Sequence, residues 1–202
     1  MARIVEFPAP GRGAYDRSLS RAERDAQHRE RLLRATAEIL LESDVTLARV
    51  IERAGVGRST FYEFFDTPEH AITHLEQRAM RALEQALSAA FSGSHTPLER
   101  LRAIARGWLR ELEARPLEGR VVLARRVHLD ALSPAGRALF VVLERTAQDA
   151  RRSGVASLDA ADDVSVLAAA GAVEALTRRH LSGQPLRDGA RTLTELIVKL
   201  LR

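Results

Sequence analysis

The 202-residue sequence contains no cysteine, which excludes disulfide bonds and thiolate metal sites and fits a cytoplasmic protein. It has no apolar run of membrane-spanning length and no signal-peptide pattern, so we expect a soluble protein. Strand-like alternation, internal repeats and glycine-rich phosphate loops are also missing. With 46% apolar residues to bury, the sequence predicts an all-α protein with one or two cores.

Lysine is almost absent as well, because Lys199 is the only lysine among 31 basic residues. The net charge of +4 is not a guide to DNA binding, since residues 1–66 carry 11 Arg and 11 acidic residues and the excess lies in residues 67–202. Up to Arg34 there is a local excess of 8 Arg over 5 acidic residues. This excess can follow a phosphate backbone or simply face solvent, and the sequence leaves both interpretations open.

The stretch from Thr46 to Asp66, TLARVIERAGVGRSTFYEFFD, predicts two short helices separated by a turn. Thr46 stands at the N-cap position of the first helix, and Gly55 can adopt the left-handed conformation that ends a helix. The apolar positions of that helix recur at helical spacing, at Leu47, Val50, Ile51 and Ala54. This is a helix-turn-helix pattern.

The second helix of the motif separates apolar from polar side chains. Phe61 and Phe65 are four residues apart and therefore share one face. The opposite face carries Arg58, Ser59, Thr60, Tyr62 and Glu63, which are residue types that contact phosphates and base edges. Together with Thr46, these residues are the predicted DNA contacts.

The run from Glu52 to Phe65, ERAGV-x-x-x-TFY-x-x-F, resembles the signature of tetracycline-repressor-like (TetR-family) transcription regulators. The resemblance implies an N-terminal three-helix DNA-binding domain and a longer helical domain that binds an effector and forms a homodimer. It also implies repression of a double-stranded DNA operator that an unknown small-molecule effector relieves. A bare motif of this kind also occurs as a tight helical corner without a nucleic-acid role, and the longer match favours DNA binding.

The sequence departs from the family pattern around the motif. Ile51 stands where a small alanine is usual, and Pro68 stands where a phosphate-contacting lysine is common. Asp66 and Glu63 add negative charge, and Glu63 can either accept a hydrogen bond from a cytosine amino group or repel the backbone. The alternative interpretation is therefore an all-α dimeric ligand- or protein-binding module that keeps the fold with weak or no DNA binding.

Helix-start and helix-stop signals divide the chain into three predicted parts. Residues 1–20 are a flexible arm that either reaches a minor groove or has no role. Residues 21–66 form the helix-turn-helix domain, and residues 67–202 form the ligand-binding and dimerisation domain. In the last part, we expect helices from Pro68 to about Ala90, from Pro97 to about Ala114, over 117–132, from Pro134 to near Gly154, over 160–182, and up to the C-terminus.

Bulky or polar residues on three successive helices of the last part are candidate effector contacts. They are Trp108, His128 and Phe140. The resemblance implies a ligand cavity among these helices, whereas the ordinary alternative is that the three residues belong to the core.

A row of small residues at 168–172 lets another helix approach closely. Leu167, Gly171 and Leu176 therefore suit a helix interface, as do Leu193, Leu196 and Leu200 on the last helix. The resemblance implies that the last two helices form the four-helix bundle of the homodimer. The alternative is that they close the core of the monomer.

Catalytic and metal-binding patterns are weak. His70 and His74 have the i, i+4 spacing of metal ligands, but no HExxH pattern accompanies them. No nucleophile elbow is visible, and the acidic residues resemble helix caps. We expect no enzymatic activity, no cofactor, no metal and no membrane partner.

Overall fold

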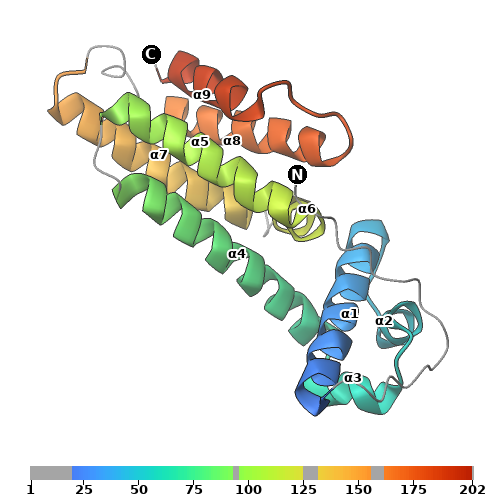
Figure 1. Cartoon of the computed structure of the whole chain (residues 1–202). Coiled ribbons are helices and arrows are strands. Elements are labelled where there is room, and N and C mark those ends of the chain that lie inside the picture. Colours follow the sequence, from blue (N-terminus) through green and yellow to red (C-terminus); the bar gives the residue numbers. More distant parts are fainter. Residues whose placement is uncertain (1–19, 93–95, 125–131, 156–161, 202) are drawn as a thin grey trace. The chain divides into compact units, whose positions relative to one another are not determined.

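The computed structural model describes residues 20–92, 96–124, 132–155 and 162–201. Within these ranges the chain forms nine α-helices and no strand, which confirms the predicted all-α class (Figure 1). The predicted arm, except Ser20, lies outside the described residues, and so does His128. The helices are α1 (Arg21–Glu42), α2 (Leu47–Ala54), α3 (Arg58–Phe64), α4 (Pro68–Ser92), α5 (Pro97–Ala114), α6 (Pro116–Ala124), α7 (Pro134–Arg152), α8 (Asp163–Leu181) and α9 (Gly189–Leu200).

The chain divides into two compact units, Met1–Leu75 and Glu76–Arg202. Helix α4 contributes its first turns to the N-terminal unit and the remainder to the second unit. The roles that we assign to the predicted domains, 21–66 and 67–202, stay predictions.

Several helices begin where the sequence places a cap. Ser20 and Glu23 form a capping box at α1, in which the backbone N–H of Glu23 donates to Ser20 Oγ at 3.2 Å and the N–H of Ser20 donates to Glu23 Oε2 at 2.8 Å. These bonds from Ser20 hold the pKa of Glu23 below its ordinary value. Thr96 and Glu99 form the same box at α5. Each box satisfies backbone donors that the first turn of a helix leaves free.

The core of the N-terminal unit lies between α1 and the two motif helices. Its largest fully buried side chains include Leu32 and Ile39 of α1 together with Phe61 and Phe65. The two phenylalanine ring centroids are 5.9 Å apart. Burying each ring stabilises the unit by roughly 1.5–3 kcal/mol, so these two side chains largely fix where α3 lies.

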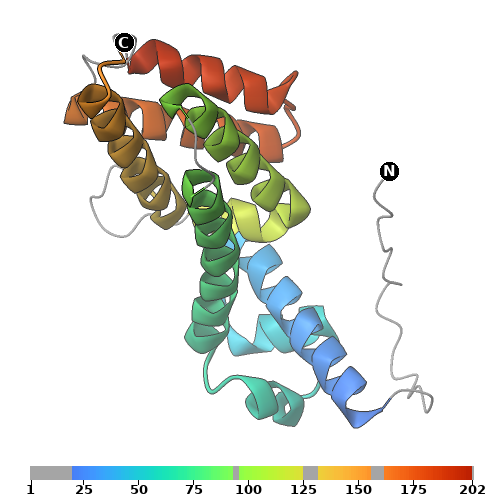
Figure 2. The same ribbon diagram turned by 60° about the vertical axis from the view of Figure 1, so that its left-hand side comes forward.

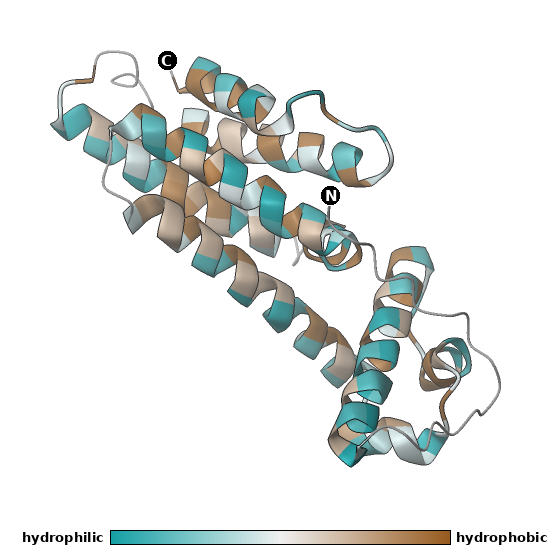
Figure 3. Ribbon diagram, viewed as in Figure 1, coloured by the Kyte–Doolittle hydropathy of each residue, from teal (hydrophilic) through white to brown (hydrophobic). Residues whose placement is uncertain are grey.

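The second unit is a helical bundle in which α5, α7, α8 and α9 share one core. Helices α8 and α9 run side by side in both views (Figures 1 and 2). Polar and apolar residues alternate around the turns of these helices, as amphipathic packing requires (Figure 3). On α5, Leu101, Ala105, Trp108 and Leu112 recur at helical spacing and are buried, but Leu98, which shares their face, remains 38% exposed. The predicted helix over 117–132 is described only from Pro116 to Ala124.

Candidate nucleic-acid interface

The turn between α2 and α3 depends on Gly55. This residue has φ 62° and ψ 41°, the left-handed conformation that the sequence predicts at this position. The N–H of Val56 donates to the carbonyl of Ile51 at 3.1 Å, and the Arg31 side chain of α1 donates to the carbonyl of Gly55 at 3.1 Å. The turn is thus fixed both by its own backbone and by α1.

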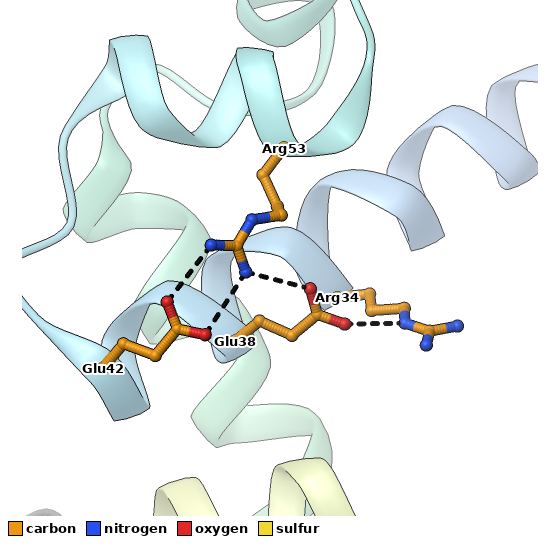
Figure 4. A network of polar contacts seen from close by, with 4 residues as sticks. All are labelled: Arg34, Glu38, Glu42 and Arg53. Atoms are coloured by element: carbon orange, nitrogen blue, oxygen red, sulfur yellow. Dashed lines mark hydrogen bonds and ion pairs between the residues drawn. The ribbon is translucent and has the colours of Figure 1, made fainter. Parts of the chain in front are cut away.

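A cluster of charged side chains joins α2 to α1 (Figure 4). Arg53 of α2 lies 3.1 Å from Glu42 and 3.4 Å from Glu38, and Glu38 also pairs with Arg34 at 3.0 Å. The hydrogen bond from Arg53 lowers the pKa of Glu42, and the same bond raises the pKa of Arg53. The cluster is exposed, so it orients α2 on α1 more than it stabilises the unit.

The polar face of α3 points away from the core. Phe61 and Phe65 are 0% and 1% exposed, whereas Tyr62 is 52% exposed and meets the Phe61 ring edge-on, with centroids 5.7 Å apart. Arg58, Ser59 and Glu63 are exposed and Thr60 is half-buried. The structure therefore brings the five predicted α3 residues onto one short helix.

These polar side chains have no partner within the described part of the chain. Arg58, Ser59, Thr60, Tyr62 and Glu63 make no hydrogen bond or ion pair there. The exposed hydroxyl of Thr46, at the N-cap of α2, makes no capping bond either. The face thus offers one guanidinium, four hydroxyls and one carboxylate to an external partner.

The arginines of α1 are committed within the unit. Arg29 donates toward His74 Nε2 at 3.0 Å, Arg31 holds the turn, and Arg34 pairs with Glu38. Two of these three arginines therefore join α1 to other parts of its own unit, and the third pairs with the next turn of α1. This observation favours α3 over α1 as the principal contact surface.

The two histidines at the start of α4 pack around Phe65. The ring centroids of His70 and His74 each lie 5.9 Å from that of Phe65, and the backbone N–H of Asp66 donates to His70 Nδ1 at 3.3 Å. In the described ranges no three His, Asp or Glu side chains gather as metal ligands. Pro68 is the first residue of α4, and Ile51 is half-buried on α2.

Two of the predicted effector contacts lie in or against the core of the second unit. Trp108 is fully buried, and its indole N–H donates to Thr177 Oγ1 at 2.8 Å. Phe140 is half-buried against the same core. Neither residue lines a hollow of about 430 Å³ that the structure shows between α4 and α7.

That hollow is a feature the sequence reasoning missed. Its lining includes Leu87, Phe91, Val141 and Arg145. The guanidinium carbons of Arg100 and Arg145 lie 4.3 and 4.2 Å from the centroid of Phe91. The sequence carries no local signal for it, because the 58% exposure of Val141 on α7 is known only from the structure.

The predicted dimer residues have different exposures. Leu167 is 40% exposed on α8, and Gly171 is half-buried. Leu176, Leu196 and Leu200 are half-buried against the core of their own unit. Leu193 is 0% exposed and has no surface to present to a second copy.

The sequence reasoning also missed a buried carboxylate of α8 that lies beside the start of α7. Glu174 of α8 is 2% exposed, forms an ion pair with Arg178, and accepts a hydrogen bond from the backbone N–H of Ser133 at 3.1 Å. A Cβ at Gly136 would lie closer than 3.0 Å to this carboxylate. Negative charge is favourable at a helix start, so Glu174 anchors α7 to α8.

Among the described helices, none is long and apolar enough to cross a membrane. No protein-family model matches the chain. No curated protein matches it either.

Solved structures do match over nearly the full length. A TetR-like transcriptional regulator from Rhodococcus sp. RHA1 is 19% identical, with a TM-score of 0.67 over 90% of this chain and 96% of that one. The TetR-family regulator PfmR from Thermus thermophilus is 19% identical, with a TM-score of 0.60 over 86% and 95%. A gamma-butyrolactone receptor (ArpA-like protein) is 19% identical, with a TM-score of 0.57 over 88% and 97%. The chain therefore has the fold of TetR-like transcriptional regulators.

Proposed function

We propose that the protein is a ligand-responsive transcription regulator that represses by binding a pseudo-palindromic DNA operator as a homodimer. The observation that carries this proposal is the polar face of α3. Its side chains are exposed, apart from the half-buried Thr60, and make no hydrogen bond or ion pair in the described part of the chain, while two buried phenylalanines hold the helix in place. Structural relatives with this fold are transcription regulators.

Each polar residue has a role in this proposal. Arg58, Ser59 and Thr60 contact base edges or phosphates, and the hydroxyls of Tyr62 and Thr46 donate to phosphates. A two-fold dimer presents two copies of α3 to half-sites roughly 34–36 Å apart or a multiple of that distance. The cytoplasm is then the expected location, since the operator lies there.

The dimer would form through α8 and α9. Leu167 and Gly171 provide an exposed face with small neighbours, and Leu196 and Leu200 extend it on α9. The apolar side chain of Val164, 71% exposed on α8, supports the same face. Leu193 is buried in its own unit and would support α9 from within, without contacting the second copy.

The effector would be a small molecule bound in the second unit. One structural relative is a gamma-butyrolactone receptor, and the hollow between α4 and α7 is lined by apolar side chains together with Glu84, two serines and Arg145. The roles of Trp108, His128 and Phe140 as ligand contacts stay predictions. Because α4 belongs to both units, a ligand that prefers one position of α4 would change the spacing of the two motifs.

Substitutions at Arg58 and Glu63 test DNA binding directly. Arg58→Ala should weaken operator binding and, if Arg58 contacts a phosphate, reduce the slope of log affinity against log salt by about one. Arg120→Ala removes the same charge from an exposed position on α6 and serves as the control, with no expected change.

Glu63→Ala separates two roles of this carboxylate. If Glu63 accepts from a cytosine, its loss should cost about 1–3 kcal/mol at the operator and relax one base position. If Glu63 faces phosphates, its loss should strengthen binding to all DNA alike.

The acidic residues near the motif favour a second candidate, a dimeric module that binds a ligand or a protein. Glu63 and Asp66 are both exposed, and Pro68 provides no side-chain donor for a phosphate. This candidate becomes the better account if neither the wild-type chain nor Glu63→Ala retains any DNA fragment at low salt.

A further inference from the structure

A long groove lies between α5 and α9 on the second unit. Its volume is about 920 Å³, and it is open to solvent along its length. The α5 side is formed by residues spaced four apart, which therefore lie in one row along that helix: Leu98, Arg102 and Arg106. The α9 side follows the same spacing through Ala190, Thr194 and Val198, with Lys199 at the edge.

The groove carries cations that the molecule does not use itself. Arg102, Arg106 and Lys199 are exposed, and none of them has a hydrogen bond or ion pair within the described residues. Arg191, also on the edge, is instead committed to Glu195 at 2.8 Å, a bond that raises the pKa of Arg191. Three uncommitted positive charges therefore border the groove, beside Asp188 and the Arg191–Glu195 pair, so the lining has two more cations than acidic residues.

Leu98, Ala190 and Val198 form the apolar part of the lining, which we call the floor of the groove. Leu98 is 38% exposed although helical periodicity places it on the buried face of α5, and Val198 and Ala190 are half-buried. An apolar floor beside a row of free cations differs from an ordinary solvated face, where charged side chains pair or cover the apolar surface.

We propose that this groove binds an acidic amphipathic helix of a partner protein. The charge complements the three free cations, and apolar residues at i, i+3, i+4 and i+7 of such a helix would cover Leu98 and Val198. Arg102 and Arg106 are separated by about 6 Å along α5, which equals the spacing of two carboxylates at i, i+4 on the incoming helix.

Other occupants fit less well. A small anionic molecule would use the cations, but the two rows of lining residues spaced four apart match the repeat of a helix. Nucleic-acid backbone would use the cations but gain nothing from the apolar floor. The proposal does not depend on DNA binding, so its failure would leave the proposed regulator role intact.

A synthetic helical peptide provides the probe. It has leucine at i, i+3, i+4 and i+7 and glutamate on the flanks, and its binding to the full-length protein is followed by fluorescence anisotropy. Two control peptides are compared with it. One carries lysine in place of glutamate, and the other has the same composition in a scrambled order without an apolar stripe. We expect the acidic amphipathic peptide to bind about tenfold or more tightly than either control, because both charge and apolar spacing contribute.

Charge reversal locates the binding site. Arg102→Glu with Arg106→Glu should weaken peptide binding about tenfold, since like charges would then face each other. The matched control, Arg115→Glu with Arg120→Glu, changes two exposed arginines outside the groove and should leave binding unchanged. All four positions are exposed, so both double variants should keep their helical circular dichroism.

Three results would overturn the proposal. The first is equal binding of the acidic and lysine peptides, or binding that the Arg102/Arg106 double variant does not weaken. The second is binding of decanoate that depends on Arg102 and Arg106 when no peptide binds, which would identify a small anionic amphiphile as the occupant. The third is loss of self-association in that double variant with no peptide binding, which would identify a second copy of the chain.

Discussion

Replacement of Gly136 by alanine should destabilise the second unit even though alanine usually favours a helix. The new Cβ would lie closer than 3.0 Å to the carboxylate of Glu174, which is 2% exposed and anchored to Ser133 and Arg178. The carboxylate must therefore move and lose its hydrogen bond from Ser133. Loss of a hydrogen bond to a charged acceptor costs about 1.5–3 kcal/mol, and alanine returns about 1 kcal/mol of helix propensity.

The expected net loss is about 0.5–2 kcal/mol, which lowers Tm by roughly 1–8 °C. Thermal and urea unfolding of the full-length protein, followed by helical circular dichroism, measures it. Gly107→Ala is the matched control, because its Cβ would meet nothing closer than 3.4 Å and should not destabilise. Equal stability of the Gly136→Ala variant and the wild type would refute the role of Glu174 as an anchor of α7.

Acid should weaken the contact between α1 and α2. Because the bond from Arg53 holds the pKa of Glu42 below its ordinary value, the stabilisation is complete above that ordinary value and is lost as the pH falls through the lowered pKa. Urea unfolding at several pH values should show a smaller acid loss in Glu42→Gln, and an unchanged pH profile would contradict this account. Gly171→Arg and Leu196→Arg should each give a monomer in sedimentation if α8 and α9 form the dimer, whereas Val141→Arg on α7 should not. If both variants remain folded and dimeric, the interface lies elsewhere.

Local signals in the sequence predicted the helix termini well. Pro97 and Pro134 begin helices as first-turn prolines, where the sequence predicts them, and Gly55 adopts the left-handed turn expected of it. These features involve residues within a few positions of each other, so the sequence contains the whole interaction. The same reasoning separated the buried phenylalanines of α3 from its polar face.

Features that depend on distant contacts could not be predicted in this way. Periodicity placed Leu98 on the buried face of α5, but it cannot indicate how far the neighbouring helices cover that face. Glu174 resembles any solvated helical carboxylate until α7 brings Ser133 beside it, 41 residues away in sequence. For the same reason, Leu193 was assigned to a dimer surface although it is buried in its own unit.

Selection of genomic DNA fragments by the purified full-length protein tests the central proposal most directly. The account predicts enrichment, at low salt, of fragments that share a pseudo-palindrome with half-sites roughly 34–36 Å or a multiple apart. Arg58→Ala should lose this enrichment, and the control Arg120→Ala should keep it. Recovery of no fragment by the wild-type chain, and none by Glu63→Ala, would contradict the DNA-binding role of α3.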